Sequence, residues 1–262
     1  MSTPVPSAQL GGLPVTAGPT SAADFWLWKA CAWAGPVYII GILVSWAGVA
    51  GFVPPPGEDW GPQKIAAFYA DNEVAIRLGM EGVLFFAMFY FIWSLAIARV
   101  MRRAEGRERI LSTIQLIGGV STAWITAGCA LLWLTASFRA HSRPPEGTAL
   151  LNDLAWMVFD MTAMATFFQM VAYGALILVD RREKPLMPRW LAYLTFWLAA
   201  SLFAVFFMPS FHTGPFSWQG LITLYIALGA FFVWTIAASW YTIVAIHRIE
   251  RDEHATISGS SE

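Results

Sequence analysis

The segment ILSTIQLIGGVSTAWITAGCALLWLTASF, residues 110–138, is predominantly apolar and contains no charged side chain. A helix needs about 20 predominantly apolar residues to cross the hydrocarbon core of a bilayer, and this run exceeds that length. A strand of a membrane β-barrel would instead alternate in polarity over about ten residues. Residues 110–138 therefore predict a transmembrane helix.

Five further stretches are long and apolar enough to do the same. They are approximately residues 33–53, 78–98, 154–179, 190–208 and 221–246. The chain of 262 residues is 57% hydrophobic and 13% charged, which is far from the composition of a soluble globular domain. We predict an all-α fold, a polytopic transmembrane bundle of six helices that occupies residues 25–250.

The basic residues predict how this bundle is oriented. When the loops are assigned alternately to the two sides, one side receives 12 of the 16 lysines and arginines. The other side holds Lys64, Arg77, Arg139 and Arg143. Loops rich in lysine and arginine stay in the cytoplasm, so we expect both termini to be cytoplasmic and the bundle to lie in the cytoplasmic membrane.

The composition of both ends of the chain predicts disordered tails. Residues 1–24 are mostly Pro, Gly, Ser, Thr and Ala, with neither the basic start nor the apolar centre of a signal peptide. We predict a disordered cytoplasmic tail for residues 1–24, and another for residues 251–262. Cys31 and Cys129 fall within or beside apolar spans, which favours burial over a disulfide.

Two loops on the outer side have distinctive compositions. DWGPQKIAAFYA, residues 59–70, has a proline at a plausible helix start and apolar residues on one side, which predicts a short helix on the outer surface. PSFHTGPFSWQG, residues 209–220, suits a compact lid over the mouth of the bundle. The cytoplasmic turns are short, so we expect spans two and three, and spans four and five, to form antiparallel hairpins.

The 14 tryptophans divide by position along the spans. Eight lie near the membrane boundaries, where we expect interfacial anchors: Trp26, Trp28, Trp60, Trp133, Trp156, Trp190, Trp218 and Trp240. Trp124, Trp197 and Trp234 lie near the middle of their spans, where an indole N–H meets no headgroup. We interpret these three as an inward-facing wall of a ligand cavity, with ordinary packing as the alternative.

Two acidic residues, Glu81 and Asp160, fall inside predicted spans, at comparable depths in the outer half. A charge at membrane depth costs about 2.5–3.5 kcal/mol, so such residues are functional candidates. We expect a polar focus of Glu81, Asp160 and Arg77, with His212 and Arg139 as additions, in which one of two adjacent carboxyls serves as a proton donor. Alternatively, Arg77 neutralises Glu81, and Asp160 forms a structural bridge to a Thr or Trp.

The sequence lacks the usual signatures of cofactor and metal chemistry. All four histidines lie in loops, in tails or at helix ends, without the spacing of a metal site, and there is no P-loop, GxGxxG or nucleophile elbow. We therefore expect no cofactor, no metal and no nucleic-acid partner.

Three short strings carry a resemblance. FHTGPFSWQGL (residues 211–221), LNDLAW (residues 151–156) and FYADN (residues 68–72) resemble a set of six-span bacterial membrane proteins of unknown function. The resemblance covers about residues 25–250 and implies architecture only. A more distant analogy is with membrane-embedded terpene cyclases, in which acidic residues near the membrane surface protonate an isoprenoid. It implies that part for Glu81 and Asp160, although those enzymes have seven spans.

Together these features favour a protein that binds an apolar or amphipathic small molecule, a lipid or an isoprenoid, in an aromatic cavity toward the outer leaflet. The expected binding residues are Trp124, Trp197, Trp234, Asp160, Glu81, Arg77 and His212. Two alternatives stay open: an acid–base enzyme with Asp160 or Glu81 as the proton donor, and a non-catalytic accessory or structural subunit. The expected partners are membrane lipids, with a homo-oligomer or a larger complex as further options.

Overall fold

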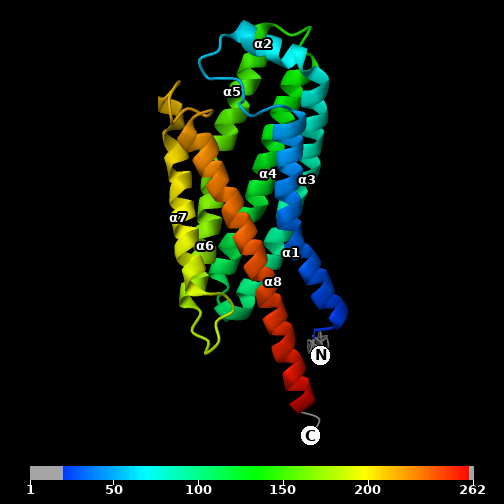
Figure 1. Cartoon of the computed structure of the whole chain (residues 1–262), viewed down its shortest axis with the longest axis vertical. Coiled ribbons are helices and arrows are strands. Elements are labelled where there is room, and N and C mark those ends of the chain that lie inside the picture. The colour runs from blue at the N-terminus through cyan, green and yellow to red at the C-terminus, as the bar shows by residue number, and fades with distance from the viewer. Residues whose placement is uncertain (1–19, 260–262) are drawn as a thin grey trace, which may run out of the picture.

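The computed structural model describes residues 20–259, and every regular element in that part of the chain is helical (Figure 1). Six helical segments are long and apolar enough to cross a membrane. They are Ala22–Val49, Glu73–Glu105, Ile110–Phe138, Pro145–Val179, Arg189–Ser210 and Leu221–Thr256. The prediction of an all-α bundle with six spans is confirmed.

Several spans contain more than one element. In chain order the elements are α1 (Ala22–Ile42), η1 (Leu43–Val49), α2 (Pro62–Asp71), α3 (Glu73–Glu105), α4 (Ile110–Phe138), α5 (Pro145–Met161), α6 (Met164–Val179), α7 (Arg189–Ala204), η2 (Val205–Ser210), η3 (Leu221–Ala227) and α8 (Leu228–Gly259). The segments η1 and η3 are π-helical and η2 is a 3₁₀ helix. All three lie in the half of the bundle that carries α2, called here the α2 end (Figure 1).

The first span begins earlier than predicted. Ser21 caps α1: its hydroxyl accepts a hydrogen bond from the Asp24 N–H at 3.2 Å, and the Asp24 carboxylate accepts one from the Ser21 N–H at 3.1 Å. This reciprocal pair satisfies two free N–H groups at the helix start. The predicted tail of residues 1–24 is therefore wrong at residues 21–24, and residues 1–19 lie outside the described part.

The last span continues beyond the predicted boundary at residue 250. Helix α8 runs to Gly259, and its polar end is held by ion pairs from Lys29 to Glu250 at 2.6 Å and from Arg103 to Glu253 at 2.8 Å. The predicted tail of residues 251–262 is wrong for residues 251–259, because α8 continues through them and Glu253 pairs with Arg103 of α3. Residues 260–262 lie outside the described part.

The predicted hairpins form, with α3 packed along α4 and α6 along α7. Close approach depends on small residues of α4. A Cβ added to Gly118 would lie 2.7 Å from the Ala165 carbonyl oxygen, and one added to Gly119 would collide with the Ser94 side chain. Small residues at such interfaces let helix backbones approach closely.

Replacing Gly119 should destabilise the bundle. We expect Gly119→Ala to lower the thermal unfolding midpoint, because overpacking costs about 1–3 kcal/mol. Gly128→Ala is the matched control on the same helix, since a Cβ there meets nothing within 4 Å. The control should keep or raise the midpoint, because alanine favours a helix by about 1 kcal/mol over glycine. A midpoint for Gly119→Ala equal to that of Gly128→Ala would contradict the packing.

The predicted surface helix between the first two spans is present. Helix α2 begins at Pro62 and lies across the end of the bundle (Figure 1). The Tyr69 hydroxyl fixes it to α5 by donating a hydrogen bond to Asn152 Oδ1 at 3.0 Å. Asn72 occupies the N-cap position of α3, but its side chain donates to the Phe68 carbonyl at 2.9 Å and does not cap α3.

Both ends of the described chain lie at the end of the bundle opposite α2 (Figure 1). The cytoplasmic location of that end stays a prediction. We expect an impermeant thiol reagent, applied to intact cells, to label a cysteine at Ser142 and not one at Glu108, in a background without Cys31 and Cys129. Both positions are exposed, and permeabilised cells should show labelling at both. Labelling of Glu108 alone in intact cells would reverse the orientation.

Candidate functional site

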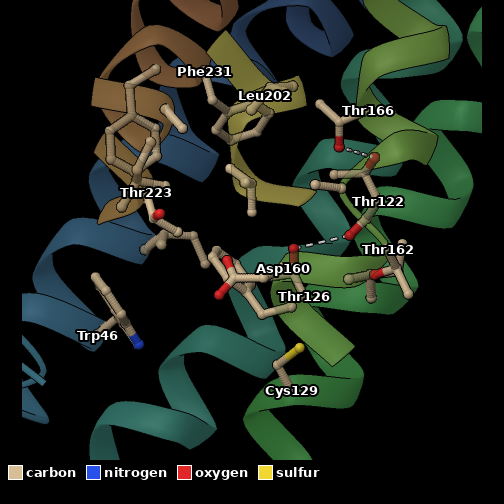
Figure 2. A pocket seen from close by; sticks show the side chains of 18 of the residues that line it. Trp46, Thr122, Thr126, Cys129, Asp160, Thr162, Thr166, Leu202, Thr223 and Phe231 are labelled. Carbon is tan, nitrogen blue, oxygen red and sulfur yellow. Dashed lines mark hydrogen bonds between the residues drawn. The ribbon is translucent and has the colours of Figure 1, made fainter. Parts of the chain in front are cut away.

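The six spans converge on one cavity in the α2 half of the bundle. Its volume is about 90 Å³. Each span contributes to its lining: Trp46, Val83, Thr126, Asp160, Leu202 and Phe231, in span order. Figure 2 shows the Asp160 carboxyl in the middle of this space, with Trp46 on one side and Thr126 and Cys129 on another.

Asp160 lies in the last turn of α5, and its side chain is only 3% exposed. This carboxyl therefore lies in the interior of the bundle. Its Oδ2 atom is buried and has no hydrogen-bond partner among the described residues. A structural bridge from this oxygen to a threonine or tryptophan, the alternative that the sequence left open, does not form.

The fourth span is interrupted directly after Asp160, which the apolar run of residues 154–179 did not predict. Between α5 and α6 the Ala163 N–H donates to the Asp160 carbonyl at 3.2 Å. The Thr162 hydroxyl donates to the Val158 carbonyl at 2.5 Å, a bond of the kind that bends helices. Irregular backbone at membrane depth is tolerated where it is buried or lines a cavity, and Thr162 and Ala163 line this one.

Hydroxyl groups join three spans at one side of the cavity. The hydroxyl oxygen of Thr122 in α4 lies 2.8 Å from that of Thr166 in α6 (Figure 2). The hydroxyl oxygen of Thr126 lies 3.5 Å from that of Tyr38 in α1. Sequence reasoning missed these residues. Thr122, Thr126 and Cys129 recur at the spacing of one helix face, and this pattern was the available signal.

An aromatic cluster covers the cavity toward α2. We call Trp46, Trp133, Trp156 and Trp218 the tryptophan cap. The rings of Trp133 and Trp156 are 5.2 Å apart between centroids, and Trp218 stacks on Trp156 at 5.8 Å. The indole N–H groups of Trp46, Trp133 and Trp156 are buried without a partner among the described residues. Two of these three donors, those of Trp46 and Trp133, belong to residues that line the cavity together with Asp160.

The predicted aromatic wall is wrong. Trp124 is 67% exposed and Trp197 is 79% exposed, so both point out of the bundle. Trp234 is buried, but it packs against Trp93 and Tyr173 and does not line the cavity. The prediction failed because position along a span gives the depth of a side chain, whereas the helical face decides whether it points inward.

The same reasoning misplaced half of the expected anchors. Trp28, Trp133, Trp156 and Trp218 are buried, whereas Trp26, Trp190 and Trp240 are exposed as interfacial anchors should be. Of these four buried residues, Trp133, Trp156 and Trp218 belong to the tryptophan cap.

The predicted polar focus does not form either. Glu81 is exposed on the outer face of α3, because Met80 and Val83 occupy the inward face of that turn. Arg77 pairs with Glu73 instead of Glu81, and it also donates to the Phe138 carbonyl at 3.1 Å. A proton shared between Glu81 and Asp160 is therefore excluded by their positions.

Arg139 and His212 also lie away from Asp160. The Arg139 guanidinium stands 5.8 Å from the ring centroid of Phe138, and His212 is exposed. The part of the predicted lid that does cover the bundle is residues 216–220, where Trp218 is 4% exposed. Its indole N–H donates to the Pro56 carbonyl at 2.8 Å, so the first and third outer loops are joined above the cavity.

Glu58 is the acidic residue that sequence reasoning missed. Its carboxylate accepts a hydrogen bond from the Trp218 backbone N–H at 2.5 Å. Burial raises the pKa of the Glu58 carboxyl, against the opposing effects of that N–H and of His212. Asp160 interacts electrostatically with Glu58 through the cap. The negative charge near Asp160 thus comes from the loop and not from Glu81.

The raised pKa of Glu58 predicts a pH-dependent contribution to folding. The folded state favours the protonated carboxyl, so this contribution is present at low pH and is lost as the pH rises through the raised pKa. The unfolding midpoint of Glu58→Gln, relative to the unchanged protein, should therefore be higher at pH 7 than at pH 4.5. The unchanged protein, measured at both pH values, is the reference, so that effects of pH elsewhere in the chain cancel. A Glu58→Gln difference that shrinks toward pH 7 would contradict the assignment.

No protein-family model, curated protein or solved structure matches this chain. The resemblance to six-span bacterial proteins stays an expectation, and the terpene-cyclase analogy loses the pair of adjacent acids on which it was drawn. The function is therefore argued from the geometry of the cavity.

Proposed function

We propose that this protein binds an amphipathic small molecule inside the bundle, with its polar group at Asp160 and its apolar part against the aromatic and aliphatic walls. The observation that carries the proposal is the Asp160 oxygen that is buried without a partner. An unsatisfied buried polar group costs about 1–3 kcal/mol, and more when it is charged. A ligand that bonds to this oxygen would offset that cost.

The volume of the cavity limits the size of the ligand. Pockets for drug-sized ligands have volumes of about 300–1,000 Å³. The cavity, at about 90 Å³, suits one slender part of a molecule, such as a headgroup with the start of a chain. This supports a narrow amphipathic molecule better than a bulky polycyclic isoprenoid.

The positions of the acids give less support to the enzymatic alternative. Acid–base chemistry of the expected kind needs two carboxyls close together, and Glu81 lies on the outer face of α3. No feature of the described residues favours an accessory subunit over a binding protein. The distribution of basic residues supports the cytoplasmic membrane as the location, with membrane lipids as the surrounding partners.

Filling the cavity should remove the bound molecule. Ala227 lines the cavity, and its neighbour Ile226 is exposed on the same π-helical segment. Native mass spectrometry of the gently solubilised protein should detect a copurified small molecule in the unchanged chain and in Ile226→Phe, and not in Ala227→Phe. Size-exclusion chromatography checks that each variant is folded. If folded Ala227→Phe retains the molecule, the molecule binds outside this cavity and the proposal is wrong.

A further inference from the structure

The cavity wall carries one acidic side chain and, among the described residues, no basic side chain accompanies it. Of the described residues that line it, Asp160 alone has a side chain that is charged in its ordinary state at neutral pH. No lysine, arginine or histidine is among them. The nearest acid in the loop above, Glu58, adds negative potential at Asp160. When Asp160 is ionised, this arrangement repels anions and attracts cations.

The walls are rich in aromatic rings. Six rings line the cavity: Tyr38, Trp46, Trp133, Phe159, Phe231 and Phe232. The negative face of an aromatic ring attracts an ammonium group, and cages of such rings recognise quaternary ammonium ligands. An acid surrounded by rings therefore offers a cation two kinds of favourable contact at once.

The cost of burying the Asp160 carboxylate without a partner also favours a cationic ligand. An ionised carboxylate that is buried without a partner is very costly, so Asp160 needs either a proton or a positive charge beside it. No cationic side chain of the described residues lines the cavity, so the chain itself does not supply that charge. A neutral ligand that forms a hydrogen bond would satisfy the oxygen atom, whereas a cation would also offset the charge of an ionised Asp160.

We infer that the molecule held at Asp160 is a lipophilic cation, an amine or quaternary ammonium whose nitrogen lies beside the carboxylate and whose hydrocarbon part lies against the rings. This rests on the proposed function and names its class of ligand. The unused N–H groups of Trp46 and Trp133 suit a hydroxyl or ether oxygen on the same molecule.

An inorganic cation fits the site less well. Metal ions are held by several oxygen, nitrogen or sulfur ligands. Among residues 20–259, as far as they are described, no group of three or more His, Cys, Asp or Glu is placed to hold one.

The test compares two probes of the same shape, of which one carries a positive charge and the other is neutral. Hexyltrimethylammonium is a cation, and 2,2-dimethyloctane replaces its nitrogen by carbon. Binding of each to the purified full-length chain in detergent is measured by equilibrium dialysis. We expect the cation to bind the unchanged protein about tenfold or more tightly than the neutral probe, the difference that one charge-assisted contact supplies.

Two variants locate the charge that matters. Asp160→Asn keeps the shape of the side chain but removes its charge, so the cation should lose about tenfold in affinity or more while the neutral probe is unaffected. Glu81→Gln is the matched control, because Glu81 is an acid of the same half of the bundle that faces outward. It should bind both probes as the unchanged protein does.

The outcomes separate the inference from the function on which it rests. Equal binding of both probes to the unchanged protein overturns the cation and leaves the binding function standing, and this comparison needs no variant to fold. Displacement of the cation by millimolar sodium or potassium also overturns it, in favour of an inorganic ion. If neither probe binds and no molecule copurifies, both the inference and the proposed function fail.

Discussion

Hydrocarbon offers no hydrogen bonds, and the rest of this structure depends on that constraint. Each backbone N–H and C=O inside the membrane needs a partner in the protein, which is why the spanning segments are helical. The same constraint sorts the side chains. The Thr122, Thr126 and Asp160 side chains turn inward and line the cavity between the spans, where the lipid-facing side would leave them unsatisfied, whereas Glu81 faces outward.

The buried polar groups differ in whether they have a partner. Nearer the chain ends, the Tyr90 hydroxyl donates to Gln169 Oε1 at 2.8 Å, Gln169 donates to Ser94 at 3.3 Å, and Trp28 donates to the Ala96 carbonyl at 3.1 Å. These bonds join the spans. Other buried groups have no partner among the described residues, both away from the cavity, as at Gln115 and Trp234, and at its wall, as at Trp46, Trp133 and Asp160. Of these, only the groups at the wall border a space that a molecule from outside the chain can enter.

The length of an apolar run was enough to predict the six spans, and the run of residues 110–138 coincides with α4. Length does not reveal which face of a helix points inward, because these spans are apolar on all sides. Trp124 and Trp197 were misplaced for that reason, and so was Glu81. Asp160 was placed correctly since an aspartate is too short to reach the membrane surface from that depth.

The parts of the site that were missed depend on contacts between distant segments. Glu58 and Trp218 lie 160 positions apart in the chain and meet only when the outer loops fold over the bundle. The break after Asp160 is equally hidden, because Met-Thr-Ala-Met contains neither glycine nor proline to mark it. A single sequence holds no record of such pairings, whereas the hydroxyl spacing along α4 was a local signal that could have been used.

Helix α8 reaches from the cavity to the far end of the molecule without interruption. Phe231 lies in the cavity wall, and Glu253 is ion-paired beyond the other end of the bundle. At 1.5 Å per residue, the 22 steps between them cover about 33 Å. A single helix thus belongs both to the cavity wall and to the charged end of the bundle. The ion pairs of Glu250 with Lys29 and of Glu253 with Arg103 therefore also fix the direction in which the wall segment at Phe231 is held.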